Sequence, residues 1–255
     1  MTSSTGMYGE PFISVRETIA WLPGAPFEDS DVLVLSSRST SPGVGGTLLY
    51  LDLRLSLPLS RASITSWGLA GLRHTLSVAP DPVRHRWDHA TVDSRGDPNP
   101  DEGEVVHRDG RDIETGVGVN PATGNKEPYE EIWRDEPLLE GSPFIFVTSS
   151  RDANEATAFM AVLGPHALAL SQESAAPNSP KKFHAVRMHQ SRSANEGAEP
   201  SWNIVFSTSN QELEEELGAL VGLASQEHEH TRGSEVSLGL RRWAVWDAGL
   251  QGASD

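Results

Sequence analysis

The ten residues LLYLDLRLSL, at positions 48 to 57, constrain the fold more than any other stretch of the chain. Leucine occupies every second position from 49 to 57, and the positions between them hold Tyr50, Asp52, Arg54 and Ser56. Successive side chains of a β-strand point to opposite faces, so this period of two predicts a strand with one apolar face and one mainly polar face.

Further segments of the same kind recur along the chain, separated by Gly, Pro, Ser and Asn. They are DVLVLSS (31–37), PFIFVTSS (143–150), TAFMAVLG (157–164), FHAVRMHQ (183–190), WNIVFSTS (202–209) and LRRWAVWDA (240–248). Many short strands between turn residues predict an all-β fold, an antiparallel sandwich or barrel. One helix is predicted near the C-terminus, over residues 210–226, because Asn210 can cap it and one stripe holds Leu213, Leu217, Leu220 and Val221.

Two segments, residues 15–38 and 128–151, share an order of features. Each has an Ile shortly before a tryptophan, which is Trp21 in the first and Trp133 in the second. Each then passes through a turn with Pro or Gly into an apolar strand and ends in Ser-Ser-Arg. This order favours a duplication, with two similar domains of about 120 residues each.

We therefore predict two antiparallel β-barrel domains, one in residues 1–122 and one in residues 123–255. Residues 93–128 are polar and rich in turn-forming residues. We interpret them as a long loop that connects the two domains, with room for one short strand. A loop of this length in a compact protein is usually a lid or part of an interface.

The excess of acidic residues makes some classes of binding partner unfavourable. The chain has 20 Lys and Arg against 36 Asp and Glu, and an acidic surface repels nucleic acid and anionic lipid. It has no cysteine, which excludes disulfides, thiolate metal sites and a cysteine nucleophile. No apolar run reaches the roughly 18 residues of a membrane span, and the segment MTSSTGMYGE lacks the features of a signal peptide. We expect a cytoplasmic protein.

Sequence motifs of common enzymes are missing. There is no Gly-x-Ser-x-Gly nucleophile turn and no phosphate-binding glycine loop. The Gly-rich stretch GVGVNPATG is a turn, because Pro121 follows Asn120 where a nucleotide-binding helix would have to begin. We predict neither a cofactor nor a metal.

The strand EPYEEIWRD, residues 127–135, holds the first candidate site residues. Tyr129, Glu131 and Trp133 share one of its faces. Inward tryptophans either fill a core or line an aromatic cavity in which a few polar groups orient a ligand. A buried carboxylate at Glu131 would need a partner or a ligand. The candidate partners are Arg54, Arg86, Arg134 and Arg187.

A second strand, HRWDHATVD, places five side chains on one face, which are His85, Trp87, His89, Thr91 and Asp93. This face suits the lining of a polar cavity, and it equally suits a solvated surface. Both alternatives stay open at this point.

The chain resembles the fungal HRI1 family over nearly its whole length. The resemblance rests on SWGLAG (66–71), RWDHATVDSR (86–95), the stretch from Asp101 to Asp135 with its ETG, NPATG and YEEIWRD segments, and the closing LRRWAVWDAG (240–249). In the second half the chain departs from the family, with Pro165-His166 in place of an Arg-aromatic pair. The resemblance implies two lipocalin-like β-barrels packed together, in agreement with the repeat.

The resemblance implies two different functions. One branch of the family is non-enzymatic, cytosolic and acts by binding proteins or small ligands. A second branch is similar to fungal hetero-Diels–Alderases of tropolone-sesquiterpenoid biosynthesis, which join an ortho-quinone methide to an alkene such as humulene. We favour the second branch, because the second half of the chain departs from the family pattern while its strands persist.

Under the Diels–Alderase hypothesis, the ligand is an apolar aromatic small molecule. The residues expected to shape its pocket are Tyr50, Trp67, Trp87, Tyr129 and Trp133. Arg86 or Arg134 would bind the tropolone oxygens, and Glu131 or His89 would transfer a proton. Under the alternative, both barrels are packed solid, and the acidic helix 210–226 docks a protein partner or a second copy of the chain.

Overall fold

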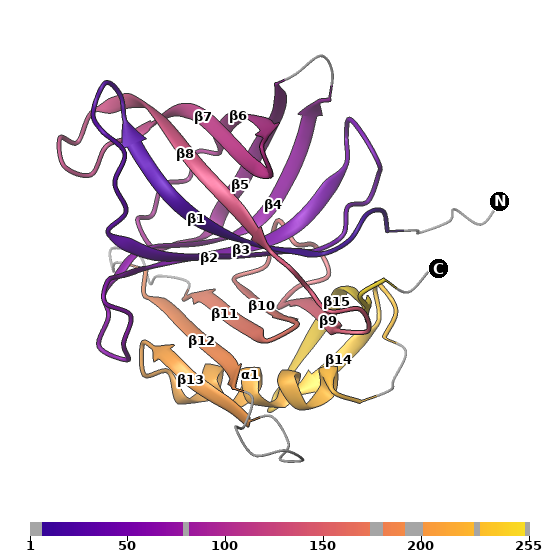
Figure 1. The fold of residues 1–255 in the computed structure, drawn as a ribbon. Coiled ribbons are helices and arrows are strands. Elements are labelled where there is room, and N and C mark those ends of the chain that lie inside the picture. Colours follow the sequence, from indigo (N-terminus) through magenta and orange to yellow (C-terminus); the bar gives the residue numbers. More distant parts are fainter. Residues whose placement is uncertain (1–6, 79–81, 174–180, 192–200, 227–229, 253–255) are drawn as a thin grey trace.

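The computed structural model describes residues 7–78, 82–173, 181–191, 201–226 and 230–252. The first half of the chain forms a closed antiparallel barrel, drawn in indigo to pink in Figure 1. Its strands are β1 (Phe12–Trp21), β2 (Ser30–Ser36), β3 (Thr47–Ser56), β4 (Thr65–Ser77), β5 (Val83–Asp93), β6 (Asp101–Arg108), β7 (Arg111–Val119) and β8 (Lys126–Glu136). The barrel closes because β1 pairs with both β2 and β8.

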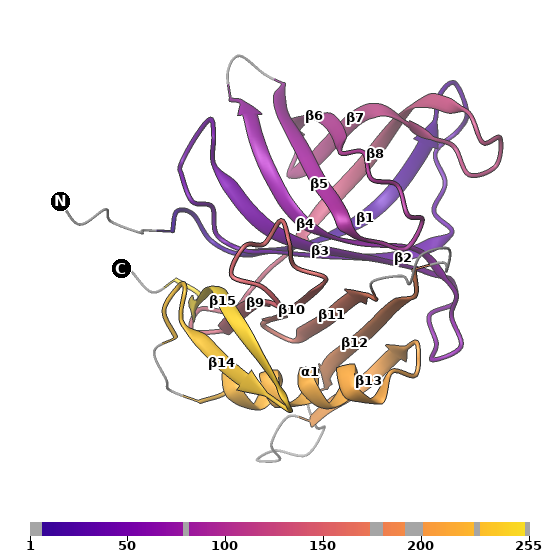
Figure 2. The same cartoon turned by 180° about the vertical axis from the view of Figure 1, so that it is seen from behind.

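The second half forms an open sheet with one helix, and it lies against the barrel in both views (Figures 1 and 2). In order across the sheet, its strands are β13 (Ser201–Ser207), β12 (Phe183–Ser191), β11 (His166–Gln172), β10 (Ala158–Leu163), β9 (Pro143–Thr148), β15 (Arg241–Leu250) and β14 (Glu235–Leu238). Helix α1 (Gln211–Ala224) connects β13 to β14. The predicted all-β class with one helix is therefore confirmed for the described residues.

A second closed barrel, expected from the sequence, is not found in the described part of the chain. Strands β13 and β14 form the two edges of the sheet and do not pair with each other. The physical reason is the helix, whose apolar stripe packs against one face of the sheet in a core with Val147, Met160 and Trp243. Side chains of α1 cover the surface that additional strands would cover in a barrel.

Helix α1 begins and packs as the sequence predicts. The side-chain oxygen of Asn210 accepts a hydrogen bond from the backbone N–H of Leu213, at 3.1 Å. The stripe predicted to face inward is buried, from Leu213 to Val221. Within the described residues, the structure contains no helix that is both long enough and apolar enough to cross a lipid bilayer.

Strand β3 has the predicted alternation, and its apolar face points out of the barrel. Leu49, Leu51, Leu53 and Leu55 are fully buried in a core that also contains Phe146 and Phe159 of the sheet. Full burial of one such leucine contributes roughly 1.5–3 kcal/mol. The alternate residues, including Tyr50 and Arg54, line the inside of the barrel. The barrel is thus apolar on the side that meets the sheet and more polar within.

The predicted connecting loop over residues 93–128 contains two barrel strands, β6 and β7. They form a hairpin through Asp109 and Gly110, whose φ angles of 53° and 71° are both positive. Asp-Gly is the sequence preferred by tight two-residue hairpin turns, which require positive φ at both positions. The sequence analysis interpreted this segment as a loop because it is polar and rich in turn-forming residues.

The predicted boundary at residues 122 and 123 stays a prediction about how the chain divides into domains. Strand β8 lies after it and completes the barrel by pairing with β1 and β7. The two segments that suggested a duplication occupy different places: β1 and β2 are both barrel strands, whereas β8 belongs to the barrel and β9 to the sheet. The structure therefore does not show two equivalent halves.

Candidate functional site

The barrel contains a cavity of about 970 Å³, which we call the lumen. All eight barrel strands contribute side chains to its wall. Its volume lies at the upper end of the range, roughly 300–1,000 Å³, that is usual for small-molecule sites. The aromatic rings in the wall belong to Phe12, Trp21, Phe27, Tyr50, Trp67, Trp87, Tyr129 and Trp133, together with the imidazole of His85.

The structure brings together all five residues that the sequence analysis assigned to substrate binding. They are Tyr50, Trp67, Trp87, Tyr129 and Trp133, and each lines the lumen. Their placement follows from strand parity, because inward positions on β3, β4, β5 and β8 recur every second residue. Their role in binding a ligand stays a prediction.

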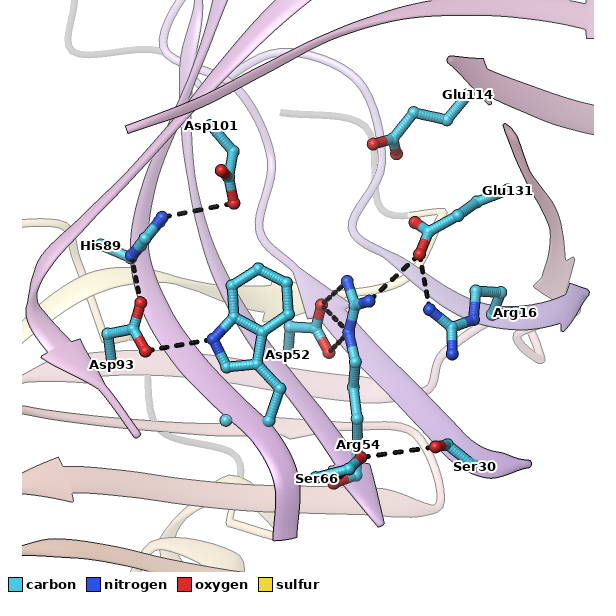
Figure 3. A network of polar contacts seen from close by, with 12 residues as sticks. Arg16, Ser30, Asp52, Arg54, Ser66, His89, Asp93, Asp101, Glu114 and Glu131 are labelled. Carbon is cyan, nitrogen blue, oxygen red and sulfur yellow. Dashed lines mark hydrogen bonds and ion pairs between the residues drawn. The ribbon is translucent and has the colours of Figure 1, made fainter. Parts of the chain in front are cut away.

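Glu131 lies at the centre of a network of charged groups (Figure 3). Its side chain is buried and accepts hydrogen bonds from Arg16 Nη1 at 2.5 Å and Arg54 Nη1 at 3.1 Å. Arg54 also pairs with Asp52, at 2.9 Å, and Arg16 pairs with Glu28, at 2.8 Å. Of the four arginines predicted as partners of Glu131, Arg54 is one; Arg16 was missed.

This network keeps its charges in spite of burial. Burial by itself lowers the pKa of Arg54, but the negative charges of Asp52 and Glu131 outweigh that effect and raise its pKa well above the ordinary value. Both arginines are therefore fixed cations, and the Glu131 carboxylate has a cation on either side. Such a network holds the inner surface of the lumen in one geometry.

Trp67 is held from three directions at the wall of the lumen. The guanidinium of Arg54 lies 4.8 Å from the centre of its ring, and that of Arg95 lies 4.1 Å away. Its indole N–H donates a hydrogen bond to Asp93, at 3.1 Å. Cation–π contacts of this kind stabilise each ring by about 0.5–2 kcal/mol, so Trp67 presents a fixed aromatic surface.

Glu114 is a titratable group in the lumen that the sequence analysis missed. It lies directly opposite Glu131 in the pairing of β7 with β8, and it accepts a hydrogen bond from the Tyr129 hydroxyl at 2.8 Å. Burial, together with the negative charge of Glu131, raises the pKa of Glu114 to about 8. Its carboxyl group is therefore largely protonated at neutral pH. The Asp109-Gly110 turn would have identified β7 as a strand, whereas the position of Glu114 opposite Glu131 comes from the next hairpin, in which residues 120–125 join β7 to β8.

Other lumen side chains have polar atoms without partners. Tyr50 Oη, Arg73 Nε and Trp133 Nε1 are buried and make no hydrogen bond with the described residues. The Arg73 guanidinium lies 5.3 Å from the centre of the Phe12 ring. Buried polar groups are nearly always hydrogen-bonded in proteins, so these three atoms mark places where a bound molecule or water would be hydrogen-bonded.

Arg86 and Arg134 do not line the lumen. Arg86 pairs with Asp88 at 2.8 Å, and Arg134 lies 3.3 Å from Glu17. Both arginines follow or precede an inward tryptophan by one residue, so the period of two directs them outward. The sequence analysis assigned each arginine to the same site as the tryptophan next to it, although adjacent residues of a strand point to opposite faces. In the structure the tryptophans line the lumen and the arginines do not.

His89 is buried outside the lumen. Its ring lies between Asp93 at 2.8 Å and Asp101 at 3.4 Å, and Trp67 packs edge-on against it. Burial lowers its pKa, but the close carboxylates of Asp101 and Asp93 outweigh burial and raise the pKa to about 9. His89 is therefore a fixed imidazolium, which positions the lumen wall through Asp93 and Trp67.

The predicted common face of β5 is divided in the structure. His85 and Trp87 line the lumen, while His89 and Thr91 line a separate pocket of about 260 Å³ that Arg86 also borders. The cause is a shift in register between β4 and β5, at Ala70 to Leu72. A bulge of this kind redirects the side chains within it. Here it leaves residues 89–91 of β5 without partners on β4, which no sequence pattern indicated. Across the described residues, no group of three or more His, Asp or Glu side chains is arranged to hold a metal ion.

The comparison with protein families assigns the chain to a family. A family model described as Protein HRI1 matches residues 12–247, which include the whole barrel and nearly all of the sheet. No curated protein and no solved structure matches the chain. Because the matched span is far more than half of the sequence, the chain belongs to the HRI1 family.

Proposed function

We propose that the lumen binds flat organic molecules and that the protein is a cofactor-free hetero-Diels–Alderase of fungal secondary metabolism, acting in the cytoplasm. The reaction would join a tropolone-like ortho-quinone methide to an alkene such as humulene. The observation that carries the proposal is the lumen itself, a cavity of about 970 Å³ with aromatic walls and unpartnered hydrogen-bond donors.

The first contribution to such a reaction is to hold the two reactants face to face. A cycloaddition needs no covalent help from the protein, and positioning alone can supply a large part of the rate. The fixed rings of Trp67, Trp87 and Trp133 offer flat apolar surfaces for this purpose. The charged network around Glu131 keeps these walls in place.

The second contribution is a donor to the oxygen of the heterodiene. Negative charge develops on this oxygen as the new bonds form, and preorganised donors stabilise it. Trp133 Nε1 and Tyr50 Oη can act as these donors, since neither has a partner among the described residues. They replace Arg86 and Arg134 in the role that we predicted from the sequence.

The third contribution is proton transfer to a benzylic alcohol precursor. The Glu114 carboxyl would protonate the leaving hydroxyl, which departs as water as the carbon–oxygen bond breaks. The ring hydroxyl of the precursor then loses its proton to the Glu114 carboxylate, which gives the quinone methide and restores the acid. A carboxyl group with a pKa of about 8 suits this role at neutral pH. Glu114 thus takes the role that we predicted for Glu131 or His89.

The test is to incubate the purified protein with the benzylic alcohol and humulene and to measure adducts against a control without protein. We expect faster formation and one dominant stereoisomer. Glu114→Gln should slow the protein-dependent reaction by about 100-fold, and the wild-type rate should fall above pH 8 as Glu114 ionises. Glu130→Gln, one position away from Glu131 and outside the lumen wall, is the matched control and should change little. Equal adduct formation with and without protein would refute the enzyme proposal.

A second candidate is a non-catalytic member of the family that binds a small ligand or a protein. The observation in its favour is that Arg16 and Arg54 have complete sets of ion pairs without any ligand. The acidic side chains of Glu212 and Glu215 on α1 are exposed and would offer a docking face. Saturable quenching of tryptophan fluorescence by a flat ligand, without any acceleration of the reaction, would assign this function.

A further inference from the structure

We propose that the end of the lumen around Arg73 is an anion subsite, so that the molecule bound there is a flat aromatic monoanion whose ionised acid group meets the Arg73 guanidinium. The inference rests on the proposed binding function of the lumen, and it specifies the ligand's charge and orientation. It also makes Arg73, which the sequence analysis did not select, the residue that determines specificity for the ligand's charge.

Arg73 differs from the other arginines that line the lumen. Arg16 and Arg54 each have two carboxylate partners. Arg95 is exposed, stacks on Trp67 and donates a hydrogen bond to the backbone oxygen of Ser66. Arg73 forms no ion pair with any described residue, and its buried Nε has no hydrogen-bond partner. It is therefore a cation inside the barrel without a counter-ion in contact.

The acidic groups nearest to Arg73 do not replace that counter-ion. Asp112, Glu114 and Asp135 all raise the pKa of Arg73, yet burial outweighs them and lowers it to about 10. Asp135 already accepts a hydrogen bond from Ser14 at 2.6 Å, Asp112 lies 2.8 Å from His107 Nδ1, and Glu114 is largely protonated at neutral pH. An anion in contact with the guanidinium would offset the cost of burial that these groups leave uncompensated.

The surroundings of Arg73 select a flat molecule. Arg73 lies opposite Trp87 in the pairing of β4 with β5 and over the ring of Phe12. Phe12 and Trp87 pack against a cluster that includes Tyr50. Tyr50 Oη supplies a further donor without a partner. Together these residues offer ring surfaces for an aromatic body and donors for an oxyanion.

His85, the remaining titratable group at this end, does not compete with Arg73 for the anion. Burial, together with the positive charge of Arg73, lowers the pKa of His85 to about 3. The imidazole is therefore neutral at physiological pH, and the guanidinium is the cation that the ligand's charge meets.

The test compares two fluorescent probes of nearly the same shape and opposite charge state: anilinonaphthalene sulfonate, a monoanion, and anilinonaphthalene, which is neutral. Both are titrated into the full-length protein, with emission excited through the lumen tryptophans by energy transfer. We expect both to bind and the anion to bind about 10-fold more tightly or better. Arg73→Met should remove that preference and leave the affinity for the neutral probe unchanged.

The matched control is Arg86→Met, which removes the same charge from a neighbouring strand outside the lumen. It should preserve the preference for the anion, and thermal unfolding checks that both variants fold. Binding of both probes with equal affinity, or a preference that survives in Arg73→Met, would overturn the anion subsite and leave the binding function of the lumen intact. Failure of both probes to bind the wild-type protein would refute the binding function as well.

Discussion

The barrel and the sheet–helix unit differ in what the two faces of their strands contact. In the sheet, both faces are apolar: Met160 and Val162 of β10 pack with α1, while Phe159 and Ala161 pack toward the barrel. In the barrel, the leucines of β3 face outward into that shared core. The inside of the barrel contains the charged network and the cavity.

This difference suggests why the interior of the barrel can hold polar and charged side chains. The core shared by the two units supplies the burial that stabilises the fold, so the inward positions of the barrel are not required to fill space. Those positions hold Arg16, Arg54, Glu114 and Glu131, side chains that are rare in protein interiors unless paired. Sites with costly polar groups commonly persist where the rest of the structure compensates for them.

The largest expected effect tests the shared core. Phe159 is fully buried between the units, so Phe159→Ala should lower the free energy of unfolding by about 3–5 kcal/mol. Trp87→Ala removes a larger ring from the lumen wall and should cost only about 1 kcal/mol, because that ring borders a cavity. Denaturant titration of both variants measures the difference. A larger loss for Trp87→Ala would show that packing of the lumen wall contributes more to the stability of the fold than the shared core does.

The second prediction compares two arginines of the lumen, one with carboxylate partners and one without. Arg54→Met leaves Asp52 without its cation and Glu131 with one cation, and should lower the free energy of unfolding by about 2–3 kcal/mol. Arg73→Met removes a cation that has no counter-ion and should raise stability, by about 0.5–1 kcal/mol. Chemical denaturation of the two variants should therefore give changes of opposite sign. Destabilisation by Arg73→Met would indicate a counter-ion for Arg73 in the free protein.

The parts of this molecule that the sequence predicts are those that depend on neighbouring residues alone. The alternation of β3 and the capped stripe of α1 are local patterns, and both are confirmed. The lumen aromatics follow for the same reason, since parity along one strand places Tyr129, Glu131 and Trp133 together.

The parts that the sequence does not predict depend on contacts between distant segments. Arg16 meets Glu131 across 115 positions of sequence, and the pairing of β1 with β8 alone brings them together. The face of His89 depends on a register shift between two strands. The open second sheet depends on where α1 packs, which its own sequence does not specify. Glu114 is intermediate, because Asp109-Gly110 is a local signal for its strand β7, but the pairing of β7 with β8 places it opposite Glu131.

The third prediction concerns His89, which supports the lumen from outside. The folded-state pKa of His89, about 9, lies above its ordinary value of 6.5, so its contribution to stability is complete below pH 6.5 and is lost as pH rises through 9. His89→Gln should lower the free energy of unfolding by about 1–2 kcal/mol at pH 7. The gap between wild type and variant should narrow toward pH 10, and thermal unfolding across this range measures it. A gap that stays constant with pH would mean that the imidazolium contributes nothing.

The smallest expected effect compares two adjacent residues of β8, one inside the barrel and one outside. Arg134 is part-exposed and pairs with Glu17 on the surface, so Arg134→Ala should change the free energy of unfolding by less than about 0.5 kcal/mol and leave ligand affinity unchanged. Trp133→Ala removes a ring and a donor from the lumen wall and should weaken binding of the anilinonaphthalene probes by about 10-fold. Fluorescence titration of the two variants compares their affinities directly. Because the residues are neighbours, any general disturbance of β8 would affect both, and only their sides of the strand differ. Equal loss of affinity in the two variants would mean that probes bind outside the lumen, and the distinction between a functional interior and a structural exterior would fail.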